Sequence, residues 1–473
     1  MAFRKTLIAL ALSVGASALQ AETIRIAIGT QDPTINTATG GLVIRELKLL
    51  EKYLPKDGKY KDAQWDIQWK SFTSGPPLTN EQVAGKLDIG SMAEFPGLLN
   101  IVAHRSAGKK SVFINVISGS VQGSGNGIVV PNDSPVQIFS ELKGKQISVP
   151  FGSTAHGVLL RAVANQGWDN ERDVTLVSQS PDVGGSALKA HKIDAHANFV
   201  PFPDLFGFRG FARKIYDGSQ DKNATFHGTL VDADYAKKYP EVVVAFLRAA
   251  IEADRLATED PEKISELIQK VTGVEAEVNY LFHGPLGLQT RDVSWKPEFR
   301  AAANTALKTL KLLKKTDLEF DANEYIDDSF IRAAYKQAGL DYEAKLKDYS
   351  KSPLKAKDAK TGATISDPKQ VAQVWIAGES RVQHFASPDN ALVAAKAAEA
   401  AGKTVRVVYA HDHNTGIKLF ANQAWFSRDT KGGLSAFLLK ADAEAWAKAK
   451  GGAVLDFAAA KTAVASAKLA SAK

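Results

Sequence analysis

Apolar and polar positions along the chain predict strands that alternate with helices. Apolar or alternating stretches at residues 23–29 (TIRIAIG), 65–72 (WDIQWKSF) and 111–118 predict strands. Between the first two, apolar residues recur at helical spacing over residues 42–53 and predict a helix. Strands that alternate with helices indicate an α/β fold.

One strand-and-loop unit occurs twice. Residues 84–96 (AGKLDIGSMAEFP) are echoed by residues 190–203 (AHKIDAHANFVPFP), and each unit predicts a short buried strand that ends in a small loop. Ligands of open α/β sheets bind beyond the carboxyl ends of strands. The repeat therefore predicts two similar lobes that face each other across a ligand cleft.

The glycine-rich residues 119–127 (GSVQGSGNG) lie between two predicted strands. They predict a hinge that crosses between the lobes. A phosphate-binding loop is the alternative, but no lysine follows the glycines and no helix opens there.

Residues 151–157 (FGSTAHG) provide the best candidate anion site. They follow a predicted strand and precede a predicted helix that ends near Asn165. The first turn of a helix presents unpaired backbone N–H groups and the positive end of the helix dipole. A plain helix cap is the alternative. The position at the end of a strand, in the lobe opposite Ser74 and Ser91, favours anion binding.

The second half of the chain divides at a polar segment. Helices predicted from Pro240, over residues 301–313 and over residues 328–338 cover the first lobe. Residues 346–365 are rich in lysine, serine and aspartate and predict a linker. The strand and helix patterns in residues 366–473 predict a separate small α+β domain.

Composition narrows the class of protein. The 473 residues suggest about three domains. Residues 1–21 have the charged, apolar and small-residue regions of a cleaved signal peptide, which predicts a soluble periplasmic protein. We expect this protein to be a monomer. The chain contains no cysteine, which excludes disulfides and thiolate sites. The net charge of +7 is not gathered into a stripe, so we expect no nucleic-acid partner.

A family resemblance covers about residues 23–342. It is carried, in order, by the runs SGPPLTNEQVAGKLDIGSMAEFP, LKGKQISVPFGSTAHGVLLRAV, SALKAHKIDAHANFVPFPDL and KKYPEVVVAFLRAA. These runs resemble the periplasmic substrate-binding proteins of the nitrate, taurine and aliphatic sulfonate ABC importers. The resemblance implies a two-lobe, type II-like α/β binding protein over residues 22–345. Lobe one would comprise about residues 22–118 and 215–345, and lobe two about residues 119–214.

The same resemblance implies a function and a set of site residues. The protein would close on a small anionic solute and present it to an ABC permease in the inner membrane, without catalysis. The implied ligand contacts are Ser74, Gly75, Ser91, Met92, Ala93, Gly152, Ser153, Thr154, His156, Phe199, Pro201 and Phe202.

The C-terminal domain carries a second resemblance. The runs AQVWIAGESRVQHFASPDNAL, VVYAHDHNTG, NQAWF and GGLSAFLLKADAEAWAKAKGGAVLDF resemble the copper-binding accessory lipoproteins of nitrous oxide reductase. Copper(I) prefers cysteine and methionine, and the chain has no cysteine and only two methionines. His411 and His413 would lie on one face of an extended segment, with His384 as a third candidate, and could hold copper or zinc. A solvated loop is the alternative, and we expect no other cofactor.

Two other functions compete with the receptor. An enzyme on the same frame could use His156, His196 and Asp194 as acid–base groups, but the sequence has no G-x-S-x-G motif and no evident nucleophile with a base. A metal-handling accessory or sensor protein would act through the C-terminal domain. We expect a receptor.

Overall fold

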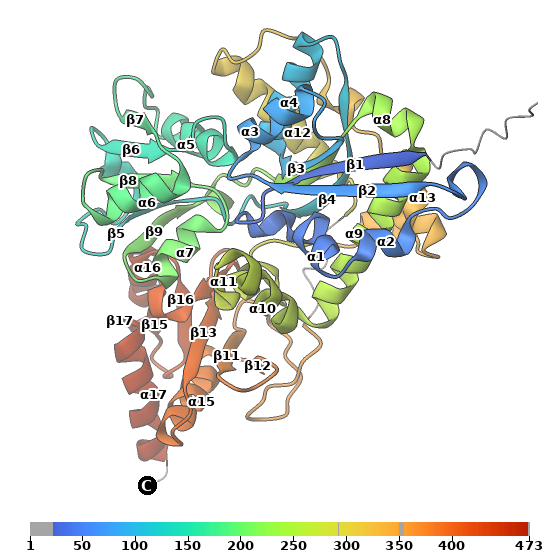
Figure 1. The fold of residues 1–473 in the computed structure, drawn as a ribbon. Coiled ribbons are helices and arrows are strands. Elements are labelled where there is room, and N and C mark those ends of the chain that lie inside the picture. The colour runs from blue at the N-terminus through green and yellow to red at the C-terminus, as the bar shows by residue number, and fades with distance from the viewer. Residues whose placement is uncertain (1–21, 292, 350–353, 472–473) are drawn as a thin grey trace, which may run out of the picture.

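The computed structural model describes residues 22–291, 293–349 and 354–471. The predicted signal peptide, residues 1–21, lies outside the described residues. Within these ranges, no helix is long and apolar enough to cross a membrane. The chain forms two α/β lobes and a C-terminal domain (Figure 1), and the predicted α/β class is confirmed.

Lobe one is built on a five-stranded sheet in the order β2-β1-β3-β10-β4. The pairs of β1 with β2 and with β3 are parallel, whereas β10 is antiparallel to both β3 and β4. The strands are β1 (Thr23–Thr30), β2 (Gln64–Ser71), β3 (Ile89–Ala93), β4 (Ser111–Ser120) and β10 (Thr225–Asp232).

Helices cover both faces of this sheet. In Figure 1, α3, α4 and α12 lie on one side of the sheet, and α1, α2 and α9 lie on the other. The helices are α1 (Leu42–Glu46), α2 (Leu49–Tyr53), α3 (Gly75–Val83), α4 (Glu94–Ser106), α8 (Ala233–Lys238), α9 (Pro240–Glu259), α10 (Pro261–Thr272), α11 (Ala276–His283), α12 (Pro297–Leu312), α13 (Ser329–Gln337) and α14 (Tyr342–Lys347), with short 3-10 turns at Ile35–Gly40, Gly58–Tyr60 and Ala322–Tyr325.

Lobe two repeats the plan of lobe one. Its sheet has the order β7-β6-β8-β5-β9, in which β6 is parallel to β7 and β8, and β5 is antiparallel to its neighbours. The elements are β5 (Gly127–Pro131), β6 (Gln146–Val149), β7 (Thr175–Ser178), β8 (Ala195–Asn198), β9 (Ala212–Asp217), α5 (Thr154–Asn165), α6 (Pro181–Lys189) and α7 (Phe202–Phe208), with 3-10 turns at Phe139–Leu142 and Gly218–Gln220. The echoed sequence units form β3 and β8, which occupy the same place in the two sheets.

Two connections join the lobes. The chain passes from β4 to β5 through the glycine-rich residues 119–127, and returns from β9 to β10 through residues 218–224. The two connections contact each other, because Gly218 N donates to Asn126 O at 2.8 Å. Gly123 has φ +81°, and a Cβ there would lie 2.2 Å from Asn223 O. Only glycine fits this close crossing.

The C-terminal domain contains two small sheets flanked by helices. One sheet has the order β12-β11-β13-β14 and the other β16-β15-β17. Its elements are β11 (Ala372–Ile376), β12 (Gln383–Phe385), α15 (Pro388–Ala400), β13 (Val405–His411), β14 (Lys418–Phe420), a 3-10 turn at Ala421–Gln423, β15 (Trp425–Arg428), β16 (Leu434–Phe437), α16 (Lys440–Lys450), β17 (Ala453–Leu455) and α17 (Phe457–Ser471).

Part of the predicted linker is fixed against this domain. The buried Asp358 carboxylate accepts hydrogen bonds from Ala386 N at 2.7 Å and from Asn390 Nδ2 at 3.0 Å. These bonds, together with those from Lys360 N and Thr361 N, hold the pKa of Asp358 at about 2 despite its burial. Asp358 therefore ties the segment that precedes β11 to the start of α15.

Two local predictions differ from the structure. The helix predicted over residues 42–53 is broken at Lys48, which has φ +52°. The loop predicted after Gly90 is a strand that enters α4 directly at Glu94.

Candidate functional site

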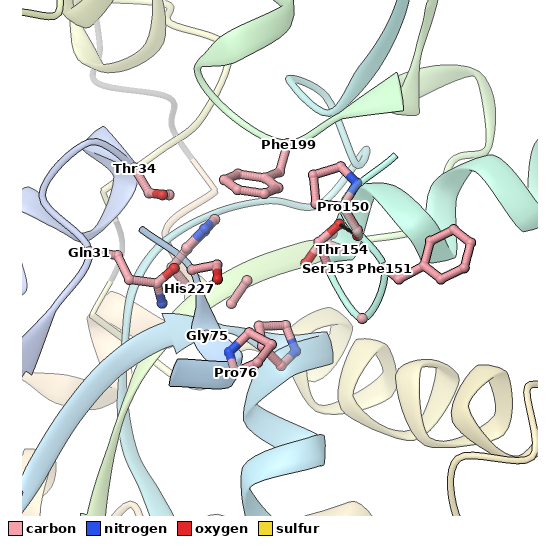
Figure 2. Close-up of a pocket in the computed structure, with 14 residues that line it drawn as sticks. Gln31, Thr34, Gly75, Pro76, Pro150, Phe151, Ser153, Thr154, Phe199 and His227 are labelled. Carbon is pink, nitrogen blue, oxygen red and sulfur yellow. Dashed lines mark hydrogen bonds between the residues drawn. The ribbon is translucent and has the colours of Figure 1, made fainter. Parts of the chain in front are cut away.

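A cavity of about 50 Å³ lies between the two lobes and is lined by 14 residues (Figure 2). This volume leaves room for only a few water-sized groups. Lobe one contributes Gln31, Thr34, Ser74, Gly75, Pro76, Ala93, Pro96 and His227, and lobe two contributes Pro150, Phe151, Gly152, Ser153, Thr154 and Phe199. The loops after β1, β6 and β8 reach the cavity, as do the end of β3 and the start of α4, as expected for ligand sites at the carboxyl ends of strands.

The helix α5 begins at the cavity. Its N-cap is Ser153, whose hydroxyl donates to Pro150 O at 2.6 Å and accepts from His156 N at 3.3 Å. The N–H groups of Thr154 and Ala155 have no hydrogen-bond partner among the described residues. The N–H of Thr154, which lines the cavity, the N–H of the adjacent Ala155 and the positive end of a 12-residue helix are therefore candidate anion-binding groups.

The helix α3 also begins at the cavity, but it offers fewer donors. Its N-cap Ser74 makes no side-chain cap hydrogen bond, and the next residues are Gly75, Pro76 and Pro77, of which only the glycine carries an N–H. A Cβ at Gly75 would lie 2.3 Å from the Pro96 ring, so a glycine is required for α3 to approach α4. The prolines make this wall of the cavity apolar.

His227, on β10, contributes a donor whose orientation is set by a chain of amides. Gln289 Nε2 donates to Ser124 O at 3.0 Å, which leaves Gln289 Oε1 to accept from Asn36 Nδ2. The same Asn36 amide nitrogen lies 3.3 Å from His227 Nδ1 and donates to it. His227 Nδ1 is thus an acceptor, and the ring proton lies on Nε2.

Burial keeps His227 neutral. Removal of the ring from water lowers the pKa of His227 to about 3, since no carboxylate compensates for the lost hydration. A neutral imidazole with its proton on Nε2 is a hydrogen-bond donor at every physiological pH. Thr34, on the same wall, has a buried hydroxyl with no partner in the described part of the chain.

None of the 14 lining residues carries a formal charge at neutral pH. Two carboxyl groups neighbour lining residues in the sequence: Asp32, which follows Gln31 and pairs with Arg45 at 3.0 Å, and Glu94, which follows Ala93 and is buried at the start of α4. Burial raises the pKa of Glu94 to about 7, although Phe226 N donates to this carboxyl at 3.2 Å. The cavity therefore offers hydrogen-bond donors and dipoles, and no ion-pair partner.

Seven of the twelve predicted ligand residues line the cavity. They are Ser74, Gly75, Ala93, Gly152, Ser153, Thr154 and Phe199. The other five, Ser91, Met92, His156, Pro201 and Phe202, do not line it.

The side chains of these five residues are engaged elsewhere. The Ser91 hydroxyl donates to Gly40 O at 3.3 Å, and Met92 is fully buried in the core. The His156 ring stacks on Phe151 at 4.5 Å, and burial lowers the pKa of His156 to about 4. Phe202 packs edge-on against the lining residue Phe199, and Pro201 is the residue before α7.

Seven lining residues were not predicted: Gln31, Thr34, Pro76, Pro96, Pro150, Phe151 and His227. Gln31 and Thr34 lie in the polar loop after the first predicted strand, a position that could have identified them. His227 lies on β10, a strand that the apolar pattern did not predict.

The residues considered for acid–base catalysis do not meet in the cavity. His196 is buried behind it, where Nδ1 lies 2.6 Å from Ser148 Oγ and Nε2 lies 2.8 Å from Asn198 Nδ2. The Asp194 carboxylate accepts a hydrogen bond from Gln146 N at 2.9 Å, at the end of β6 and β8 that lies away from the cavity. Neither residue lines the cavity.

The histidines of the C-terminal domain have protein partners. His411 is buried, with Nδ1 at 2.7 Å from Val371 O and Nε2 at 3.3 Å from Leu286 O. His413 packs against Phe437 and Trp446, and His384 Nδ1 lies 3.1 Å from Gln373 Nε2. In the described part of the chain, no three His, Cys, Asp or Glu side chains are grouped so that they could hold a metal ion.

Comparisons with known proteins agree with this architecture. Residues 83–264 match the family model described as NMT1/THI5 like. The chain is 28% identical over 278 residues to a protein of Escherichia coli K12 named "Putative aliphatic sulfonates-binding protein", and the match covers 58% of this chain and 81% of that protein. It is also 28% identical over 289 residues to the taurine-binding periplasmic protein of Escherichia coli K12, covering 58% of this chain and 86% of that one.

Among solved structures, the chain is similar to the alkanesulfonate-binding protein SsuA of Xanthomonas axonopodis pv. citri bound to MOPS. The TM-score is 0.54 with 21% identity, and the match covers 65% of this chain and 99% of SsuA. The chain thus has the two-lobe fold of periplasmic binding proteins, with an additional C-terminal sheet domain. The two relatives named above and SsuA are binding proteins.

Proposed function

We propose that this protein is the periplasmic solute-binding receptor of an ABC importer, and that its solute is a small aliphatic sulfonate. The observation that carries the proposal is the interlobe cavity, which combines the free N–H groups of α5 with the Nε2–H of His227 and has no charged side chain. The similarity to sulfonate- and taurine-binding proteins supports it.

The donors of the cavity suit an anion whose charge is spread over several oxygens. Thr154 N, Ala155 N and His227 Nε2 come from opposite lobes, so one tetrahedral headgroup can bridge them when the lobes close. Hydrogen bonds to an anion in a desolvated site are stronger than neutral ones and need no full counter-charge. We expect Thr34 to supply a fourth donor, because its buried hydroxyl has no partner in the described residues.

The rest of the lining selects the tail of the solute. Pro76, Pro96, Pro150 and Phe199 present apolar surface to the cavity. No lining carboxylate is present to pair with an ammonium group, so a taurine-like zwitterion would lose its hydration without compensation. An alkanesulfonate with a short uncharged tail fits this lining better than taurine, and it buries more apolar surface than nitrate.

Transport would follow from closure of the lobes. The receptor binds its solute between two lobes joined by two connections, and a permease in the inner membrane would recognise the closed form. The chain would act as a carrier and not as an enzyme, since His196 and Asp194 lie outside the cavity.

Thermal unfolding of residues 22–473 tests the proposal. The panel consists of ethanesulfonate, taurine and nitrate, with ethylammonium chloride as a cation control. A ligand at about 100 times its Kd adds about 2.7 kcal/mol to the free energy of unfolding, which shifts the melting temperature visibly. We expect the largest shift with ethanesulfonate. No shift with any of the anions, or a larger shift with the cation, would contradict the proposal.

Thr34→Val provides a matched test of the site. It replaces a hydroxyl by a methyl group at nearly constant volume, and we expect the Kd for ethanesulfonate to rise about tenfold because a hydrogen bond to an anion is lost. Thr175→Val, at an exposed position on β7, is the control and should leave the Kd unchanged.

A further inference from the structure

The C-terminal domain contacts both lobes at once. In Figure 1 it lies below α7 of lobe two and α11 of lobe one. Its strands β13 and β14 contact α11, and Phe420 at the end of β14 contacts Phe208 at the end of α7. It therefore spans the two bodies whose relative movement opens and closes the cavity.

The contact with lobe one is extensive and polar. Arg406 Nε lies 2.6 Å from Glu277 Oε1, and Tyr409 OH donates to Glu277 O at 2.8 Å. The buried Glu262 accepts from Val382 N at 3.0 Å and pairs with Arg381 at 2.9 Å. These bonds fix the domain to the helices α10 and α11.

Lys418 shows that this contact is closed to water. Its side chain is fully buried, and Nζ lies 4.2 Å from the centre of the Tyr280 ring and 4.5 Å from that of Tyr409. Lys418 Nζ donates to the carbonyl oxygens of Tyr280 and Pro285 at 3.3 and 3.4 Å, and burial lowers the pKa of this amine well below its usual value. Lys418 belongs to the C-terminal domain, whereas its partners Tyr280 and Pro285 belong to lobe one. Separation of the domain from lobe one would therefore break these contacts and expose Lys418 to water.

The contact with lobe two is smaller and apolar. The rings of Phe208 and Phe420 lie 5.1 Å apart. A Cβ at Gly207 would lie 2.3 Å from Gln423 Oε1, so α7 approaches the domain very closely at this glycine. The domain is thus anchored on lobe one and touches lobe two through one helix end.

The helix α7 connects this contact, at its C-terminal end, to the cavity at its N-terminal end. α7 begins three residues after Phe199, which lines the cavity, and Phe202 in its first turn packs against Phe199. The domain also reaches the hinge, because His411 Nε2 contacts Leu286 O in the loop whose Leu288 O accepts from the Ser124 hydroxyl. Gln289 in the same loop orients Asn36 and thereby His227.

The lobes are closed in this arrangement. The helices α4 of lobe one and α5 of lobe two are in contact, and a Cβ at Gly157 would lie 3.5 Å from the Phe95 ring. The contact of the C-terminal domain with α7 is therefore formed together with the closed form of the cavity.

We propose that the C-terminal domain is an intramolecular clasp that favours the closed arrangement of the two lobes. It is anchored on α10 and α11 and holds lobe two through Phe208 and Gly207. Arg209, which follows α7, also pairs with Glu275 of lobe one at 2.9 Å, so the domain and lobe one hold the same end of α7 in the closed arrangement, and the clasp adds to the stability of that arrangement. By linkage, a solute that closes the lobes and the clasp that holds them strengthen each other.

The sequence contains no cysteine, so thiol-reactive spin labels attach only to cysteines introduced for the measurement. Spin labels at Ser106→Cys on α4 and Gln166→Cys beside α5 report the distance between the lobes, and both positions are exposed. Double electron–electron resonance, a pulsed electron paramagnetic resonance method, measures this distance in residues 22–473 without ligand. The test therefore does not depend on the identity of the solute.

Phe208→Ala removes the ring that contacts Phe420, and Phe211→Ala is the matched control. Phe211 is a ring of similar burial in lobe two that packs on Phe206 within the lobe. Gly207→Leu is a second variant, which inserts a side chain between α7 and Gln423. Circular dichroism and the melting temperature verify that each variant is folded.

We expect Phe208→Ala and Gly207→Leu to populate a longer distance between the lobes, whereas Phe211→Ala retains the distance of the parent protein. Where ethanesulfonate binds the parent, its Kd should rise severalfold in the first two variants and remain unchanged in the control. If both folded clasp variants retain the distance distribution of the parent, the proposal is overturned. A failure of ethanesulfonate to bind the parent would contradict the proposed function and leave the distance measurement as the test of the clasp.

Discussion

The two lobes share one strand plan but contribute different chemistry to the cavity. In each sheet, the loop after the same parallel strand reaches the cavity, after β1 in lobe one and after β6 in lobe two. The loop after β6 enters the helix α5 and presents backbone N–H groups. The loop after β1 enters a short 3-10 turn and presents the side chains of Gln31 and Thr34.

The antiparallel strands β10 and β5, at equivalent places in the two sheets, also differ in what they contribute to the cavity. β10 carries His227 into the cavity, whereas its counterpart β5 contributes no lining residue. In the proposed site, lobe two would therefore bind the solute through its backbone, which a side-chain substitution alters little, and lobe one would bind it through side chains. A repeated fold thus sets where a ligand would lie, while the local residues set which groups it would meet.

The largest expected effect comes from removing a backbone donor in lobe two. Thr154 is the first residue of α5, where proline is well tolerated, and Ser153 before it is extended, with φ −93° and ψ 165°. Thr154→Pro should therefore retain the helix but lose one N–H and one hydroxyl. We expect the Kd for ethanesulfonate to rise by about 10- to 100-fold, measured by calorimetry.

Thr154→Val separates the two groups, since it keeps the N–H and loses only the hydroxyl. If Thr154→Val weakens binding as much as Thr154→Pro, the side chain and not the backbone of lobe two is the donor. The contrast between the lobes would then be lost.

The next effect concerns the side-chain donor of lobe one. His227→Phe keeps a ring in the cavity but removes the Nε2–H, and we expect the Kd to rise about tenfold. His104→Phe, which replaces a buried histidine of α4 outside the cavity, is the control for burial of a new ring. Equal affinities of the His227→Phe variant and the parent would remove His227 from the site.

A third prediction concerns pH and uses Glu94 of lobe one. Its pKa is raised from 4.5 to about 7 in the folded protein, so above pH 4.5 the unfolded chain releases a proton that the folded chain retains until about pH 7. Burial of this carboxyl therefore costs stability as the pH rises through this window. Glu94→Gln should raise the free energy of unfolding by up to about 3 kcal/mol at pH 8 and by almost nothing at pH 4, measured by urea titration. An equal effect at both pH values would contradict a raised pKa.

The smallest expected effects on affinity are those of substituting Ser91 or Ser153 by alanine. The hydroxyls of Ser91 and Ser153 both donate to backbone carbonyl oxygens, at 3.3 Å to Gly40 and at 2.6 Å to Pro150. Neither substitution to alanine should change the Kd by more than about twofold, since neither hydroxyl is free for the solute. Ser153→Ala should in addition lose about 1 kcal/mol of stability, because it removes the cap of α5. A strong loss of affinity in Ser91→Ala alone would place the solute deeper than the cavity described above.

Sequence patterns predicted the parts of the fold that depend on local order. The echoed units at residues 84–96 and 190–203 became β3 and β8 in equivalent places, because a short apolar run between polar turns leaves a buried strand as its main option. The strand and helix around residues 151–157 were predicted for the same reason, and Ser153 and Thr154 line the cavity at this point.

The rest of the cavity depends on pairing between distant segments. His227 reaches the cavity because β10 inserts antiparallel beside β3, with His227 opposite Ala93, a register between residues more than a hundred positions apart. Ser91 was expected at the site, but the strand continues to Ala93 and turns the Ser91 hydroxyl towards Gly40. Side-chain direction at the end of a strand changes with a shift of one residue, so sequence alone could not fix it.

The contacts of the C-terminal domain are the least visible in the sequence. Lys418 and Glu262 look like ordinary surface residues, yet both are buried where the domain meets lobe one. Their burial follows only from the contact between the C-terminal domain and lobe one. The same holds for Gly207, whose role appears only from the approach of Gln423.

A crystal structure of residues 22–473 with ethanesulfonate would show whether neutral donors of both lobes hold the anion. We expect sulfonate oxygens within hydrogen-bond distance of Thr154 N and Ala155 N in lobe two and of His227 Nε2 in lobe one, with the ethyl group against Phe199 and the prolines. A sulfonate bound elsewhere, or one whose oxygens contact a lysine or arginine in place of these neutral donors, would contradict this expectation.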